Sequence, residues 1–70
     1  MKNGVSADDL TVLVAVVREG GFRAAGRRLG MAASNVSTTV SRIEEQLGIP
    51  VLRRTTRSLH LTDAGKLLVD

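Results

Sequence analysis

A run of small polar side chains between residues 34 and 42 carries the clearest chemistry in this sequence. Two valines interrupt this run, and its polar members are Ser34, Asn35, Ser37, Thr38, Thr39, Ser41 and Arg42. Hydroxyl and amide groups donate and accept hydrogen bonds with little net charge, which suits the base-pair edges in the major groove of DNA. Serine, threonine and asparagine are mediocre helix formers, so solvent exposure alone does not explain why they gather here.

Charge is distributed unevenly along the chain. Between Gly20 and Leu61 there are seven arginines against Glu44 and Glu45, a formal charge of +5, whereas the two ends together carry −2. The arginines are Arg23, Arg27, Arg28, Arg42, Arg53, Arg54 and Arg57. A guanidinium forks onto phosphate oxygens or onto the edge of guanine, so the expected partner of this segment is a polyanion.

The composition argues against several other functions. The 70 residues contain no cysteine and one histidine, His60, so neither a metal site nor an enzyme is expected. No cofactor is expected either, because the glycines form no phosphate loop. Phe22 is the only aromatic residue, which argues against stacking of single-stranded bases. The apolar stretch from Leu10 to Val17 is too short to cross a membrane and no signal peptide precedes it, so the expected location is cytoplasmic.

Hydrophobic spacing predicts three helices that would position the polar groups. After a flexible tail over residues 1–5, Ser6 is the expected N-cap of the first helix and Gly20 its end. The expected buried stripe of this helix consists of Leu10, Leu13, Val14 and Val17.

The second and third helices are expected to form a helix-turn-helix. The second covers residues 22–29, where Ala25 and Gly26 are small enough for another helix to approach closely. A tight turn at Gly30 leads to the third helix, expected over residues 34–47. Its apolar positions follow one another by four, three and four residues, at Val36, Val40, Ile43 and Leu47. The polar face on its opposite side is then the one that can enter a major groove.

After this helix the pattern changes from helical to alternating. Val51-Leu52 runs into a basic segment over residues 53–58, and apolar and polar residues then alternate at Leu59-His60-Leu61. This predicts two short strands whose basic tip makes them a wing. Thr62 can cap one more helix, within which Leu67, Leu68 and Val69 would need a partner. The expected fold is mainly α with a small β-wing, a winged helix-turn-helix over residues 6–61 of three helices and a two-stranded wing, followed by the start of a further helix.

Several short motifs occur together and in order. They are Gly20-Gly21-Phe22-Arg23-Ala24-Ala25, Arg28-Leu29-Gly30, Val36-Ser37, Arg42-Ile43-Glu44, Leu47-Gly48, Arg54-Thr55-Thr56-Arg57-Ser58-Leu59 and Leu61-Thr62-Asp63-Ala64-Gly65. In this order the sequence resembles the N-terminal domain of the LysR-type transcriptional regulators, from about Asp9 to the C-terminus without a gap. So many spaced matches make the resemblance specific.

The resemblance implies sequence-specific binding of double-stranded DNA by a bacterial domain of this fold. It implies base-edge contacts at Ala33, Ser34, Asn35, Ser37, Thr38 and Arg42. Contacts of the wing to the backbone or minor groove are implied at Arg54, Thr55, Thr56 and Arg57, and the charges of Arg23 and Arg53 add to them. Residues 62–70 are then the truncated start of a dimerising linker helix, and the complete protein is a homodimer or homotetramer on nucleoid DNA. Its small-molecule effector would bind in a domain absent here.

Three positions depart from the usual pattern of that family. Ala32 and Ala33 stand where a serine cap and a glutamine or proline are usual, so Ser34 is expected to cap the third helix. Thr38 stands where arginine or lysine is common, which removes a long reach into the groove. Arg23 replaces a small hydroxyl residue. We therefore expect the fold to be kept and the preferred DNA sequence to differ.

Two other functions are compatible with parts of the sequence. A winged-helix module for protein–protein contact would use the same fold and would tolerate alanine at Thr38 and Arg57. A protein that coats DNA without sequence preference would instead place lysine and arginine on the third helix. The neutral polar face of that helix argues against coating.

Overall fold

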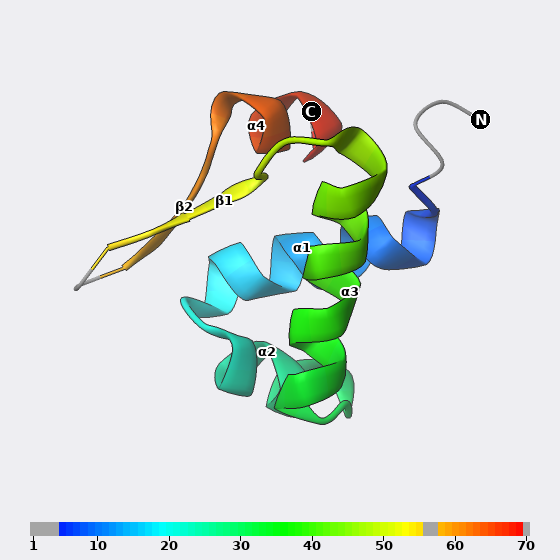
Figure 1. Cartoon of the computed structure of the whole chain (residues 1–70). Helices are drawn as coiled ribbons and strands as arrows, with labels where there is room; N and C mark the ends of the chain where they lie inside the picture. Colours follow the sequence, from blue (N-terminus) through cyan, green and yellow to red (C-terminus); the bar gives the residue numbers. More distant parts are fainter. Residues whose placement is uncertain (1–4, 56–57, 70) are drawn as a thin grey trace.

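The described part of the chain folds into four helices and one antiparallel pair of strands (Figure 1). The computed structural model describes residues 5–55 and 58–69. In chain order the elements are α1 (Ala7–Glu19), α2 (Phe22–Leu29), α3 (Ala33–Leu47), β1 (Leu52–Arg54), β2 (Leu59–Leu61) and α4 (Asp63–Val69). The predicted fold class, mainly helical with a two-stranded wing, is confirmed.

The ends of the helices follow the capping signals in the sequence. The Ser6 hydroxyl accepts a hydrogen bond from the backbone N–H of Asp9 at 3.1 Å, which confirms Ser6 as the N-cap of α1. The helices α1, α2 and α3 end at Gly20, Gly30 and Gly48, each with a left-handed backbone conformation. At Gly30, where φ is 73°, this conformation turns the chain sharply from α2 toward α3.

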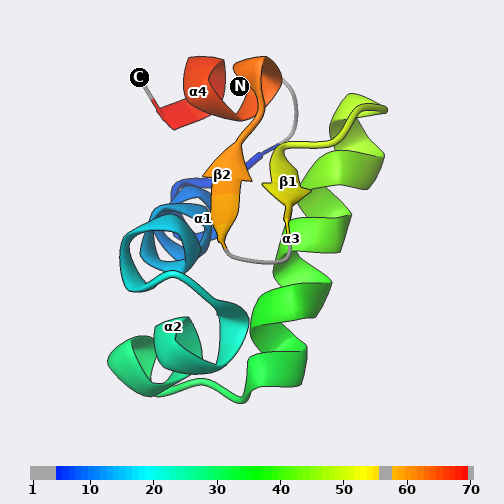
Figure 2. The same cartoon turned by 90° about the vertical axis from the view of Figure 1, so that its left-hand side faces the viewer.

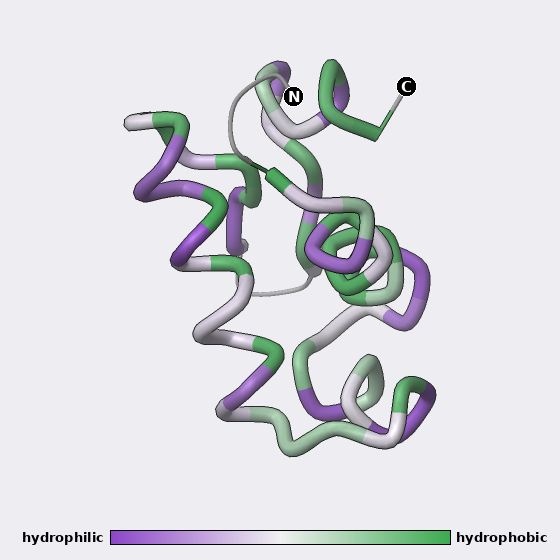
Figure 3. Tube along the Cα trace, turned by 90° about the vertical axis from the view of Figure 1, so that its right-hand side faces the viewer, coloured by the Kyte–Doolittle hydropathy of each residue, from purple (hydrophilic) through white to green (hydrophobic). Residues whose placement is uncertain are grey.

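The core is aliphatic, and α3 packs against it with one face. The predicted stripe of α3 is confirmed, because Val36, Val40 and Ile43 are buried and Leu47 packs against them half-buried. Figure 3 shows the hydrophobic segments of α3 recurring on the side that faces the rest of the molecule. Thr39 is also buried, with 6% exposure, and therefore belongs to the inner side of the helix.

In α1 the predicted stripe is only partly correct. Leu13 is buried as expected, but Leu10, Val14 and Val17 are half-buried. The side of α1 that reaches the core carries Val12, Leu13, Ala15 and Val16. The reason is that α1 is contacted by α2, α3, β2 and α4, so its apolar residues are shared among several neighbours.

Val5 lies in the core, although the sequence predicted a flexible tail at this position. Val5 is 8% exposed, whereas the predicted flexible segment covered residues 1–5. It lies directly before the N-cap Ser6, so the start of α1 brings it against the core. The rest of that segment, residues 1–4, lies outside the described residues.

Gly26 allows the turn between α2 and α3 to lie directly against α2. A Cβ atom at this position would be 2.5 Å from the carbonyl oxygen of Met31 and 3.4 Å from the nitrogen of Ala33. The Met31 N–H also donates to the Gly26 carbonyl at 2.8 Å. Close approach at Gly26 was predicted, and the approaching group is the backbone of the turn and the start of α3.

The wing projects from the body of the domain (Figure 1), and in Figure 2 it is seen in front of α1 and α3, with β2 in contact with α1 and α4. Its strands pair Leu52 with Leu61, Arg53 with His60 and Arg54 with Leu59. The Thr62 hydroxyl donates to the Pro50 carbonyl at 2.7 Å and accepts from the N–H of Gly65 at 3.2 Å, which confirms Thr62 as a cap of the last helix.

We expect the substitution Gly26→Ala to destabilise the domain. In an open helix this change stabilises by about 1 kcal/mol, but here the added methyl meets the Met31 carbonyl and should cost about 1–3 kcal/mol. Urea unfolding followed by circular dichroism measures the difference. Gly21→Ser is the control, because nothing lies within 4 Å of a Cβ at Gly21 and serine is a better N-cap. Equal or higher stability of Gly26→Ala would contradict the close approach.

Candidate nucleic-acid interface

The outer face of α3 begins one residue earlier than predicted and has no side-chain cap. Ala32 occupies the N-cap position, where its side chain makes no hydrogen bond, and Ala33 is the first helical residue. Ser34, expected to act as the cap, lies inside the first turn and is exposed. The expectation of a capping role for Ser34 is therefore wrong, and its hydroxyl is directed to the surface of the helix.

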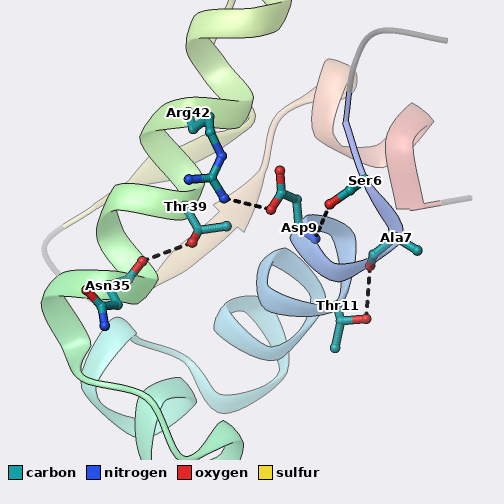
Figure 4. A network of polar contacts seen from close by, with 7 residues as sticks. All are labelled: Ser6, Ala7, Asp9, Thr11, Asn35, Thr39 and Arg42. Carbon is teal, nitrogen blue, oxygen red and sulfur yellow. Dashed lines mark hydrogen bonds and ion pairs between the residues drawn. The ribbon is translucent and has the colours of Figure 1, made fainter. Parts of the chain in front are cut away.

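The hydroxyl groups of α3 differ in how they are engaged. Thr38 donates its hydroxyl hydrogen to the carbonyl of Ser34 at 2.9 Å, and Thr39 donates to the carbonyl of Asn35 at 3.0 Å (Figure 4). By contrast, within the described residues the carboxamide of Asn35 and the hydroxyl of Ser37 have no hydrogen-bond partner. Asn35 and Thr38 are exposed, whereas Ala33 and Ser37 are half-buried.

Arg42 is held by α1. Its Nη2 atom donates to Oδ1 of Asp9 at 2.8 Å, and the side chains are 49% and 11% exposed (Figure 4). The hydrogen bond from the guanidinium, together with the opposite charge of Asp9, raises the pKa of Arg42 above its ordinary value. The family resemblance implied a base-edge contact for Arg42, whereas the structure gives its guanidinium a contact within the protein.

Glu44 connects α3 to the wing, a role that the sequence analysis missed. Its Oε2 atom accepts hydrogen bonds from the backbone N–H groups of Val51 at 2.9 Å and Leu52 at 3.4 Å. Glu44 is half-buried, whereas the neighbouring Glu45 is exposed. The two N–H groups belong to the residues that lead into β1, so the carboxylate fixes where the wing leaves the body of the domain.

The arginines of β1 have different surroundings. The guanidinium of Arg54 lies over the ring of Phe22 at the start of α2, 4.7 Å from the ring centroid. Successive side chains of a strand point to opposite faces, so Arg53 lies on the other face of the wing, where its cross-strand neighbour is His60. Both arginines are exposed, as is Arg23 on α2.

The described end of the wing is closed by hydrogen bonds between Thr55 and Ser58. The Thr55 N–H donates to the Ser58 carbonyl at 2.9 Å, and the Ser58 N–H donates to the Thr55 hydroxyl at 3.0 Å. Ser58 also shares a 2.7 Å hydrogen bond with the His60 ring, so His60 is a wing side chain, as expected. Thr56 and Arg57, two of the predicted wing contacts, lie outside the described residues.

The helix α3 and the wing bring small polar side chains and arginines close together. A small polar pocket between α3 and the wing is lined mainly by Phe22, Ser37, Ser41, Glu44, Leu52 and Arg54. Exposed hydroxyl and amide groups lie on the first turns of α3, and five exposed arginines lie on the neighbouring α2 and β1, namely Arg23, Arg27, Arg28, Arg53 and Arg54. Among the described residues, Arg42 is the one arginine that is paired with a carboxylate.

The described residues contain neither a metal-ligand cluster nor a membrane-spanning helix. No group of three or more histidine, cysteine, aspartate or glutamate residues there is arranged to hold a metal ion. None of the helices described is long and apolar enough to span a bilayer.

The fold and this surface define a winged helix-turn-helix domain. Residues 7–66 match the family model described as bacterial regulatory helix-turn-helix protein, lysR family. The chain therefore belongs to this family, and the resemblance identified from its motifs is confirmed.

Characterised relatives of the domain are named as transcriptional regulators. The regulator CrgA of Neisseria meningitidis (serogroup C, strain 8013) is 50% identical over 60 residues, which are 86% of this chain and 20% of that protein. The activator AaeR of Escherichia coli (strain K12) is 45% identical over 58 residues, 83% of this chain and 19% of that protein. The chain thus spans about a fifth of the length of these relatives.

Solved structures of the same family have the same fold. The complex of the BenM DBD with catB site 1 DNA has a TM-score of 0.83 and 33% identity, covering 91% of this chain and 69% of that one. Full-length LysG of Corynebacterium glutamicum has a TM-score of 0.84 and 31% identity, covering 93% of this chain and 22% of that one.

We expect Glu44→Ala to destabilise the domain far more than Glu45→Ala. The first change leaves the N–H groups of Val51 and Leu52 without their acceptor and should cost about 1–3 kcal/mol, whereas the second removes an exposed carboxylate and should cost less than about 0.5 kcal/mol. Both variants lose the same charge, so a difference between them in urea unfolding reports the contribution of the hydrogen bonds to stability and not the effect of net charge. Equal stability of the two variants would exclude a structural role for Glu44.

Proposed function

We propose that this chain is the DNA-binding domain of a bacterial LysR-type transcriptional regulator and binds double-stranded DNA with sequence preference. In this proposal the first turns of α3 enter the major groove, and the wing lies on the backbone and minor groove. The observation that carries it is the neutral hydrogen-bonding face of α3, with Ser34, Asn35 and Thr38 exposed between basic elements. The structural similarity to a BenM DBD bound to DNA supports it.

The charges of the surface fit this orientation. The exposed arginines of α2, which are Arg23, Arg27 and Arg28, and the wing residues Arg53 and Arg54 are suited to phosphate contacts. Glu45 is exposed on a later turn of α3, where a phosphate would be repelled. The start of α3 therefore approaches the base pairs and its end lies farther away. We assign further backbone or minor-groove contacts to Thr55, Thr56 and Arg57.

We propose that the domain proper covers residues 6–61 and that residues 62–70 begin a linker helix of a longer, oligomeric protein. Leu67 is 81% exposed on α4, while Leu68 and Val69 lie beside Leu10 and Val14 of α1. An apolar side chain this exposed is suited to contact with a second subunit. Full-length LysG is one relative solved with a bound effector, arginine, and by analogy we assign effector binding to another domain. The role proposed here is non-enzymatic and cytoplasmic.

The DNA-binding proposal predicts a steep dependence on salt concentration. With about four phosphates neutralised per domain, a plot of log affinity against log salt concentration should have a slope near −4. Fluorescence anisotropy with a labelled pool of random duplexes, at several stated salt concentrations, measures it. No detectable binding, or affinity independent of salt, would contradict the proposal.

Alanine variants of the two β1 arginines test the roles of the wing. Arg53→Ala should weaken binding to all duplexes alike and make the slope less negative by about 1, with unchanged stability. Arg54→Ala should do the same and also destabilise the domain by about 0.5–1 kcal/mol, because its contact with Phe22 is lost. Lys66→Ala on α4 removes the same charge far from the proposed interface and serves as the control. A Lys66→Ala effect as large as that of Arg53→Ala would exclude a specific role for the wing.

A further inference from the structure

The outer face of α3 lacks the side chain most often used to recognise guanine. Arginine and lysine read guanine through its O6 and N7 atoms, which both accept hydrogen bonds. Within Ala33–Leu47 the chain has one arginine, Arg42, and no lysine. The Arg42 guanidinium donates to Asp9 of α1, so it is already engaged within the protein.

Arg42 cannot leave Asp9 without an energetic penalty. Asp9 is 8% exposed, and Arg42 is the only side chain among the described residues that donates to its carboxylate. Withdrawal of the guanidinium would leave a buried negative charge without its partner, which is strongly unfavourable. The ion pair therefore holds the one long cationic side chain of α3 against α1 through its Nη2 atom.

Thr38 presents a restricted set of groups to a base. Its hydroxyl hydrogen is donated to the Ser34 carbonyl, so the oxygen that faces outward is left as an acceptor. Thr38 also carries a methyl group. An acceptor can pair with the amino group of adenine or cytosine, and a methyl group can contact the methyl of thymine. Neither can satisfy the two acceptors of guanine.

Asn35 supplies the complementary donor and acceptor pair. Its carboxamide is exposed and has no hydrogen-bond partner among the described residues. It precedes Thr38 by three residues, so both side chains lie on one face of the helix. A carboxamide forms two hydrogen bonds with adenine, accepting from N6 and donating to N7. Ser34 and Ser37 can pair with any base and do not discriminate.

From these contacts we propose that α3 reads an adenine–thymine sequence, with Asn35 paired to an adenine in the major groove, Thr38 beside a thymine methyl and no guanine-specific contact by this helix. This inference rests on the DNA-binding function proposed above. It assigns specificity to Asn35 and Thr38, and it gives the Asp9–Arg42 ion pair the additional effect of excluding guanine recognition.

Selection of bound duplexes from a random pool, at a stated salt concentration, is the first test. The chain should select adenine–thymine pairs at the positions that α3 contacts, and Asn35→Ala should lose the preference for one adenine by between about fivefold and about 150-fold. Gln46→Ala removes a carboxamide from the exposed end of the same helix and should leave the selected sequence unchanged. Circular dichroism confirms that each variant is folded.

Two further measurements assign the contact to the major groove and to Thr38. Replacement of the selected adenine by 7-deazaadenine removes its N7 acceptor and should weaken binding of the parent chain, but not of Asn35→Ala. Thr38→Arg restores a long cationic side chain and should add a guanine to the selected sequence. Thr38→Val retains the methyl group of threonine and replaces the hydroxyl with a second methyl, so it should keep the thymine preference.

The outcomes separate this inference from the function on which it rests. If the parent chain binds no duplex in the anisotropy assay, the DNA-binding proposal itself is wrong. If it binds and selects a guanine whose preference changes in Asn35→Ala or Thr38→Val, only the adenine–thymine assignment is overturned. An unchanged selection by Asn35→Ala, or equal affinity for adenine and 7-deazaadenine, would likewise overturn the role of Asn35.

Discussion

The contact between the apolar sides of α1 and α3 is the constraint on which the surface of this domain depends. Leu13 and Val16 of α1 and Val36 and Ile43 of α3 are completely buried in one cluster. Because these residues occupy one side of α3, its opposite side is free to carry small polar groups that contribute little to stability. The domain has no disulfide that could replace this contact, since the sequence contains no cysteine. The aliphatic core therefore determines which side of α3 faces outward.

Two charged contacts refine the position that the core gives to α3. Arg42 joins α3 to the first turn of α1 through Asp9, and Glu44, two residues later, joins it to the start of β1 through Val51 and Leu52. Arg54 adds a contact from the other end of β1 to Phe22. Each of these charged side chains lies close to the proposed interface, yet two of them, Arg42 and Glu44, have their functional groups engaged within the protein. Sequence position alone therefore does not separate the residues that hold the domain together from those that remain available to a partner.

Local signals in the sequence predicted most of the fold. The cap at Ser6, the glycines that end the helices, the stripe of α3 and the alternation in the wing are all short-range patterns, and the structure confirms them. The misses involve residues far apart in the chain. No local pattern links Asp9 with Arg42, 33 positions away, or shows that several elements share the apolar residues of α1. The capping role given to Ser34 was wrong because the chain starts α3 at Ala33 without any side-chain cap.

The backbone of Val51 joins three parts of the domain. Its N–H donates to Glu44 of α3 at 2.9 Å, and its carbonyl accepts from the N–H of Thr62, just before α4, at 3.0 Å. The same carbonyl lies against Gly65, where a Cβ atom would collide with it. The Val51 side chain is completely buried as well, so this residue is held on its backbone and side-chain sides alike. A rotation of α4 about its axis would therefore displace Val51. Through Val51 it would also shift the start of the wing and the contact of Glu44 at the end of α3.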